Sequence, residues 1–180
     1  MSTRATSKTE NQMLLTALFR NREEAERAYQ SLRDKGYSPH EIDVMMSDMT
    51  RDKYYRNGKT ELGTKALEGA GAGGAIGGTI GAIVGGIAAI GTNIVLPGLG
   101  LVVAGPIAAA LAGAGAGGFT GGLIGALIGW GIPEERAKLY ENGIREGGTV
   151  LGVRPRTAED AEYFDNEWRR PEYRGEHIYR

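Results

Sequence analysis

Residues 69–133 contain no aspartate, glutamate, lysine, arginine or histidine, and this uncharged run of 65 residues constrains the fold more than any other feature. Every charged side chain lies before or after it. Such a long apolar segment needs a cover, because large exposed apolar patches mark contacts with a partner or with lipid. The charge pattern predicts five parts in chain order: a polar N-terminal tail (1–11), a first folded half (12–48), a linker (49–65), an apolar helical hairpin (66–132) and a second folded half (133–180).

The uncharged run contains an internal repeat, in which residues 69–86 and residues 113–130 are identical at 12 of 18 positions. In each copy five glycines recur at every fourth residue, and a second row of glycine and alanine runs beside them. Isoleucine, leucine and valine fill half of the other positions and lie away from these rows, so a helix would carry one flat glycine face and bulky apolar residues on its other faces. The predicted helix-packing residues are Gly69, Gly73, Gly77, Gly81, Gly85, Gly113, Gly117, Gly121, Gly125 and Gly129.

Glycines at this spacing predict close contact between helices. Each glycine inside a helix costs about 0.8–1 kcal/mol relative to alanine, and contact between two glycine faces can offset that cost. A disordered linker is the alternative, but linkers lack the interleaved bulky apolar residues. Because Pro97 and Pro106 do not fit inside a regular helix, we expect a glycine-zipper hairpin of helices at about residues 65–90 and 106–131, joined by an apolar connection.

Lipid or other copies of the chain can cover this hairpin. Each predicted helix of about 26 residues is ~39 Å long and can cross a ~30 Å hydrocarbon core, and Trp130 has the position of an interfacial anchor. Two features disfavour lipid as the cover: the connection has no charged anchor, and glycine and alanine contribute little free energy to membrane insertion. We expect association with the inner membrane, with both flanks on its cytoplasmic side. The alternative is a soluble cytoplasmic assembly, and both environments require self-association.

The two charged flanks predict one small α+β domain, a ferredoxin-like sandwich that the hairpin interrupts. Asn21 and Glu24 have the spacing of a capping box, Gly36 has the position that ends a helix, and Thr157 is expected to cap the last helix. The predicted helices lie at residues 22–35, 133–146 and 157–168, and the predicted strands at residues 13–19, 42–47, 149–153 and 176–179.

The composition offers little material for catalysis or metal binding. The chain has no cysteine and only two histidines, His40 and His177, whereas a metal site needs three or four converging ligands. Glu134, Glu135 and Glu141 are better explained as helix-capping and solvent-facing residues than as an acid–base group. With 21 basic and 22 acidic residues, the chain lacks the basic excess of a nucleic-acid-binding protein. We therefore expect no catalytic residues, no cofactor, no metal and no nucleic-acid partner.

Two further patterns also have structural explanations. Residues 69–74 match a dinucleotide fingerprint in letters, but no strand precedes them and no acidic ribose ligand follows. Residues 168–174 mix arginine with aromatic residues, as binders of single-stranded nucleic acid or lipid headgroups do. The interspersed acidic residues favour a folded or docking tail instead.

Residues 131–140 (GIPEERAKLY) and 141–153 (ENGIREGGTVLGV) resemble a bacterial stress-protein family, whose members are called general stress or low-temperature-induced proteins. The resemblance includes residues 17–25 (ALFRNREEA), Gly36 with Tyr37, and the glycine-rich hairpin, and it covers about residues 15–153. It implies a stress-linked bacterial protein without established catalytic residues, so no active site follows from it.

Together these features predict a non-enzymatic, stress-associated protein whose glycine-zipper hairpin drives homo-oligomerisation and membrane association. The alternative is a soluble scaffold (a shell, ring or filament) in which hairpins pack against one another without lipid. The expected partners are other copies of the chain and membrane lipid. Gly77→Leu or Gly121→Leu should disrupt assembly, whereas Gly152→Ala should leave it intact, because it lies outside the repeat.

Overall fold

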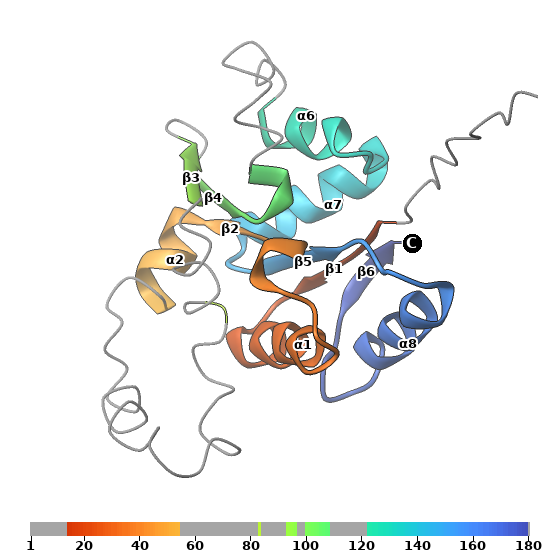
Figure 1. Cartoon of the computed structure of the whole chain (residues 1–180). Helices are drawn as coiled ribbons and strands as arrows, with labels where there is room; N and C mark the ends of the chain where they lie inside the picture. The colour runs from red at the N-terminus through yellow and green to blue at the C-terminus, as the bar shows by residue number, and fades with distance from the viewer. Residues whose placement is uncertain (1–13, 55–82, 84–92, 97–99, 109–121, 180) are drawn as a thin grey trace, which may run out of the picture.

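Six antiparallel strands form one sheet, in the order β3-β4-β2-β5-β1-β6 (Figure 1). The computed structural model describes residues 14–54, 83, 93–96, 100–108 and 122–179. Strand β5 lies between β1 and β2, with Val153 opposite both Leu15 and Ile42. The strands are β1 (Leu15–Phe19), β2 (Ile42–Ser47), β3 (Asn93–Leu96), β4 (Leu101–Ala104), β5 (Thr149–Val153) and β6 (Glu176–Tyr179).

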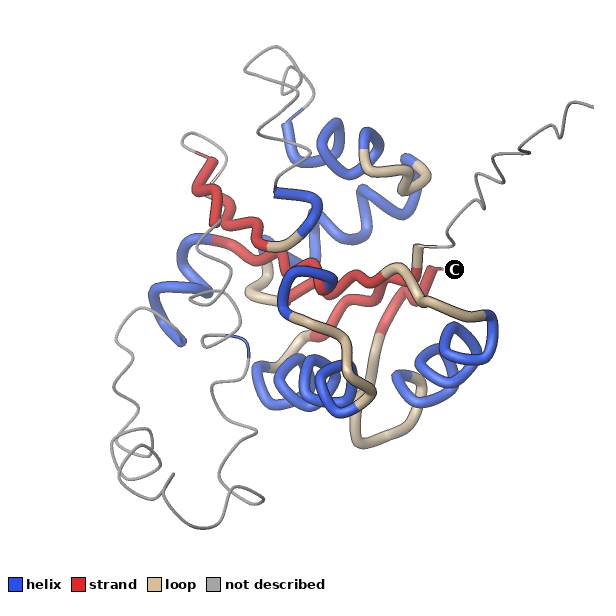
Figure 2. The backbone as a smooth tube through the Cα atoms, viewed as in Figure 1, coloured by secondary structure: helices blue, strands red, loops and turns tan. Residues whose placement is uncertain are grey.

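Helices cover both faces of this sheet (Figures 1 and 2). Helices α1 (Arg22–Asp34) and α8 (Ala158–Trp168) pack on one face, and α6 (Gly122–Gly129) and α7 (Glu134–Arg145) pack on the other. A short 3₁₀ turn, η1 (Pro39–Glu41), precedes β2, and helix α2 (Asp48–Tyr54) follows it.

Two apolar clusters follow from this arrangement, one on each face of the sheet. Side chains of a strand alternate between the two faces, so Phe19 joins the cluster under α1 and α8, while its neighbour Leu18 joins the cluster under α6 and α7. In β2, Val44 and Met45 divide in the same way. Because both faces are covered, β1, β2 and β5 are buried along their whole length, which explains their mostly apolar sequences.

The helix ends illustrate how local sequence sets the boundaries. Gly36, with a φ of +84°, follows α1, and the backbone N–H of Tyr37 donates to the carbonyl of Leu32 at 3.1 Å, as in a Schellman motif. The expected capping box at the start of α1 is wrong: Asn21 makes no side-chain bond to the backbone, and its Nδ2 donates to Glu24 Oε1 at 3.0 Å. The amide and carboxylate therefore bond to each other instead of to the backbone.

The α+β class and the secondary structure of the charged flanks are confirmed. Strands β2, β5 and β6 have the predicted bounds, and α1, α7 and α8 begin and end within one residue of the expected positions. The Thr157 cap on α8 is also confirmed, because its Oγ1 accepts a hydrogen bond from the backbone N–H of Asp160 at 3.0 Å.

Two predictions about the middle of the chain need correction. Residues 48–54 form helix α2 and not the start of a linker. The predicted apolar connection of the hairpin forms β3 and β4, which extend the sheet from the edge of β2. The physical reason is the isoleucine, valine and leucine content of residues 93–96 and 101–104, which suits a strand that joins an available sheet edge. The predicted tail (1–11), the rest of the linker (55–65), and residues 66–82, 84–92 and 109–121 of the hairpin lie outside the described residues.

Candidate functional site

The second glycine-rich repeat contributes helix α6, whose two faces have different environments. Leu123 and Leu127 are buried in the cluster that α6 shares with α7 and the sheet. A Cβ atom added to Gly125 or Gly129 would meet no atom within 4 Å in the described part of the chain. Ile128 is 43% exposed. Helix α6 therefore packs by its leucines, whereas its two predicted packing glycines have no described atom against the position of a Cβ; Gly129 is exposed and Gly125 is half-buried.

The first repeat contacts the opposite side of the sheet through Ile83. This residue is fully buried in the cluster under α1, and its backbone N–H donates to Glu26 Oε2 of α1 at 3.0 Å. Glu26 is itself buried and lies 3.7 Å from the guanidinium of Arg22. In the alignment of the two repeats, Ile83 corresponds to Leu127. The two equivalent residues are thus buried on opposite faces of the sheet.

The predicted glycine-zipper hairpin stays a prediction. Ile83 of the first repeat and Leu127 of the second are buried on opposite faces of the sheet, and in an antiparallel hairpin these two equivalent residues would lie near opposite ends. Of the ten predicted packing residues, Gly125 and Gly129 lie in α6. The other eight lie outside the described residues: Gly69, Gly73, Gly77, Gly81, Gly85, Gly113, Gly117 and Gly121.

A buried carboxylate anchors the start of the second predicted hairpin helix (residues 106–131) to β2. Asp43 is 1% exposed, and its Oδ1 accepts a hydrogen bond of 2.6 Å from the backbone N–H of Ile107, where the chain is helical. Burial raises the pKa of Asp43 to about 7, against the opposing effects of that hydrogen bond and the charge of Arg154. Gly105 makes this approach possible, because a Cβ there would lie 2.3 Å from the carbonyl oxygen of Ile42.

Trp130 has a structural role instead of the predicted position at a membrane interface. It is 9% exposed, and a Cβ added to Gly152 of β5 would lie 2.3 Å from its Cη2 atom. The indole therefore lies directly on the backbone of β5, which is possible because residue 152 has no side chain. Gly152→Ala is consequently unsuitable as a neutral control, since it would force Trp130 to move.

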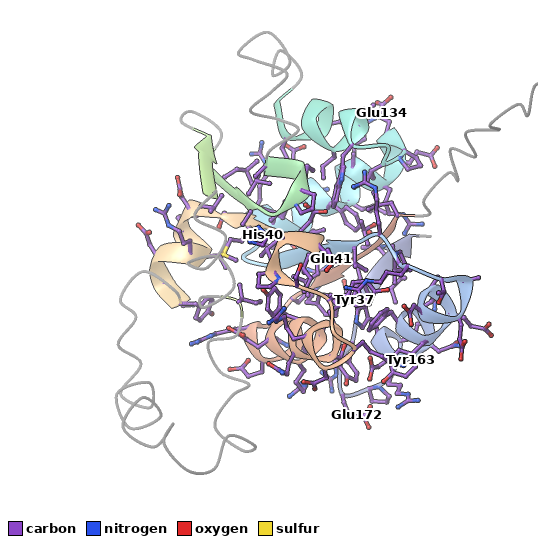
Figure 3. The ribbon with its side chains drawn as sticks, in the orientation of Figure 1. Tyr37, His40, Glu41, Glu134, Tyr163 and Glu172 are labelled. Atoms are coloured by element: carbon purple, nitrogen blue, oxygen red, sulfur yellow. The ribbon has the colours of Figure 1, made fainter. Side chains whose placement is uncertain are left out.

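The histidines do not gather carboxylates around them. His40 is exposed on η1, while its neighbour Glu41 accepts a hydrogen bond from the backbone N–H of Ser38 and pairs with Arg156, each at 2.8–2.9 Å (Figure 3). These contacts with Ser38 and Arg156 lower the pKa of Glu41. Asp43 is buried against Ile107. Among the described residues no group of three or more histidine, aspartate or glutamate side chains converges on a metal position.

Two of the glutamates of α7 form ion pairs along the surface of their own helix. Glu134 pairs with Lys138 at 2.6 Å and Glu141 pairs with Arg145 at 2.8 Å, each four residues along the chain. Glu134 lies at the outer edge of the molecule, far from Tyr37 and Tyr163 (Figure 3). This arrangement matches a solvent-facing helix and brings no two of these carboxylates together for acid–base chemistry.

The arginine- and aromatic-rich segment at residues 168–174 is folded against α1. Trp168 is fully buried and packs edge-to-face on Phe19 with ring centroids 5.6 Å apart. Arg27 of α1 donates to the backbone carbonyl of Glu172 at 2.8 Å, and Arg169 pairs with Asp165 at 2.8 Å. The segment therefore has the folded character that its acidic residues predicted.

The sequence did not reveal a cluster of polar side chains between α1 and α8. There the hydroxyls of Tyr163 and Tyr173 both donate to Oε1 of Glu167 at 3.0 Å. Glu167 is 6% exposed. The four-residue spacing of Tyr163 and Glu167 was the available signal, but Tyr173 approaches only because the chain turns back after α8.

Comparisons with known proteins add no relative to this description: no protein-family model, no curated protein and no solved structure matches the chain. No helix in the described part is both long and apolar enough to cross a membrane.

Proposed function

We propose that this chain is a non-enzymatic, stress-associated protein that assembles with copies of itself through the glycine face of α6. The stress link rests on the resemblance of residues 17–25 and 131–153 to the general stress proteins. The assembly is supported by one observation above others: α6 buries Leu123 and Leu127 in its own core, yet Gly129 is exposed, Gly125 is half-buried, and no described atom lies against the position of a Cβ on either glycine. A flat glycine face suits a second backbone, because it allows close van der Waals contact.

The same geometry favours a soluble assembly over a hairpin that spans lipid. A spanning hairpin would carry its connection to the far side of the bilayer, whereas β3 and β4 are hydrogen-bonded into the sheet beside β2. Asp43 adds a second attachment at Ile107, near the start of the second predicted hairpin helix. The proposed location is therefore the cytoplasm.

Membrane association remains a second candidate, because the uncharged run of residues 69–133 is a specific observation in its favour. In this version, assembled copies contact the cytoplasmic side of the inner membrane through residues of that run. Glycine and alanine add little insertion energy, so contact at the surface is the form that the composition favours.

We also propose that the charged flanks form a ferredoxin-like unit. The support is the order β2-β5-β1-β6 of four antiparallel strands, with α1 connecting β1 to β2 and α8 connecting β5 to β6 on one face. In this proposal, β3, β4, α6 and α7 form an insertion between the two βα halves.

The test is the mass of the native particle in dilute, detergent-free buffer, measured by light scattering after gel filtration. We expect the wild-type chain to form a defined oligomer and Gly125→Leu to reduce its mass, since a leucine side chain would separate the two backbones. Gly125→Ala is a milder variant: it should stabilise α6 by up to about 1 kcal/mol and still weaken assembly. Loss of assembly with gained stability cannot result from unfolding.

Asn166→Leu on α8 is the matched control, because it adds an exposed leucine on the opposite face of the sheet. A monomeric wild-type chain, or an oligomer whose mass is unchanged in Gly125→Leu, would contradict the proposal. Flotation with vesicles of anionic phospholipid separates the two candidates, because only the membrane version predicts that the protein moves with the lipid.

A further inference from the structure

The cluster between α1 and α8 contains a charged group with one unused oxygen. Tyr163 and Tyr173 both donate to Oε1 of Glu167 at 3.0 Å, which fixes the orientation of the carboxylate. Oε2 is buried and accepts no hydrogen bond from any described residue. A buried carboxylate oxygen without a donor is costly, so this atom calls for a ligand that brings one.

A cavity of about 290 Å³ lies beside this carboxylate. Tyr163, Glu167 and Tyr173 line it on one side, and residues of α1 line it on the other. Its volume is close to the lower limit of pockets that hold small organic molecules. Helices α1 and α8 lie on the face of the sheet opposite α6 (Figure 1), and the residues that line the cavity come from α1, α8 and the segments that follow them, so the inference does not depend on assembly through α6.

Two cationic side chains, Lys35 and Arg27, also line the cavity, and both are exposed. Lys35 Nζ lies 3.9 Å from the centroid of the Tyr163 ring, and Arg27 Nε is bonded to the carbonyl of Glu172. Asp34 is also exposed and lines the same cavity, so the two cations leave the exposed rim with a net positive charge, which attracts an anionic group. The cavity therefore offers an acceptor inside and two cations at its mouth.

A metal ion fits this donor set poorly. Calcium and magnesium require several oxygen ligands, and the other carboxylate of the cavity, Asp34, already accepts a hydrogen bond from Gln30 at 2.7 Å. A primary ammonium fits better, because it can pair with the Glu167 carboxylate and lie beside tyrosine rings. An anionic group on the same molecule would then face Lys35 and Arg27.

We propose that the cavity between α1 and α8 binds a small zwitterion, with a primary ammonium on Glu167 and a carboxylate or phosphate against Lys35 and Arg27. Two sources carry this chemistry: a free amino acid, and an ethanolamine phosphate, either free or as a lipid headgroup. The two opposite charges of a zwitterion match the two opposite charges of the site, whereas a ligand with one charge matches only one of them.

Isothermal titration calorimetry on the full chain tests the proposal with four probes: γ-aminobutyrate, O-phosphoethanolamine, butyrate and n-butylammonium. We expect saturable binding of at least one zwitterion, and binding at least tenfold weaker for the two single-charge probes. Glu167→Gln should weaken zwitterion binding by about tenfold to a hundredfold, because it replaces a charge-assisted hydrogen bond with a neutral one. Glutamine can still accept from the two tyrosines, so this variant should retain the fold.

Lys35→Gln should weaken zwitterion binding and leave n-butylammonium unaffected or bound more tightly. Glu162→Gln, at an exposed position on the same helix, is the matched control and should bind as wild type. If the wild-type chain co-sediments with phosphatidylethanolamine vesicles and Glu167→Gln does not, the ligand is a lipid headgroup. If the chain binds γ-aminobutyrate and does not co-sediment with these vesicles, the ligand is a free amino acid. Absence of saturable binding by both zwitterions, n-butylammonium binding as tight as theirs, or zwitterion binding unchanged in Glu167→Gln would each overturn the proposal.

Discussion

Replacing Asp43 with asparagine should remove a pH-dependent loss of stability in the folded chain. The side chain of Asp43 lies on the α6–α7 side of β2, is 1% exposed, and accepts a hydrogen bond from the backbone N–H of Ile107. Asparagine has nearly the same shape, and its side-chain oxygen can accept the same bond. The substitution therefore removes the ionisation of this group and keeps its contact.

The magnitude follows from the pKa of Asp43, which burial raises from 3.8 to about 7. Between these two pH values the folded chain holds a proton that the unfolded chain has released, so the free energy of unfolding falls as the pH rises. A shift of about three units corresponds to about 4 kcal/mol. This stabilisation is fully present below about pH 4 and is lost as the pH rises through about 7.

Urea denaturation between pH 4 and pH 9, at one protein concentration, measures the effect. Other groups titrate in the same range, but they contribute equally to both variants and disappear in the difference. We expect wild type and Asp43→Asn to have similar stability near pH 4 and Asp43→Asn to be more stable by several kcal/mol at pH 8. Glu162→Gln, an exposed carboxylate variant, should follow the wild-type curve.

Parallel stability curves for wild type and Asp43→Asn across this range would refute the reasoning. That result would mean that Asp43 ionises with an ordinary pKa, and so that water or a cation reaches it in the folded chain. A variant that is less stable than wild type at every pH would show instead that the contact with Ile107 needs the carboxylate.

Two further substitutions test how the fold is held together. Gly152→Ala should lower the free energy of unfolding by about 1–3 kcal/mol in urea, because its Cβ would lie 2.3 Å from Trp130. Trp130→Leu should lower the free energy of unfolding less in the Gly152→Ala chain than in wild type, because the close contact with residue 152 is then relieved. Strictly additive losses would refute the contact. Thr157→Ala should cost about 1 kcal/mol in thermal denaturation, because it removes the acceptor for the backbone N–H of Asp160. An unchanged melting temperature would mean that the cap contributes nothing.

The secondary structure of the flanks could be predicted because its signals are local. A glycine after a helix, a threonine before one and short apolar runs act over a few residues, so α1, α8 and β5 lie where the sequence placed them. The candidate chemistry was harder to locate. Glu167 and Tyr173 are joined by the turn after α8, and nothing in their spacing distinguishes them from ordinary surface residues.

Local patterns did not predict where the segments of the glycine-rich run lie in the fold. The sequence determined by itself that residues 69–133 are uncharged and that they contain two copies of one pattern, and it predicts that this pattern is covered. Only the tertiary structure decided that β3 and β4 join the sheet and that Ile83 and Leu127 are buried on opposite faces of it. The reason is that a pattern fixes which face of a segment avoids water, whereas the element that covers this face depends on which edges and surfaces the rest of the chain leaves open.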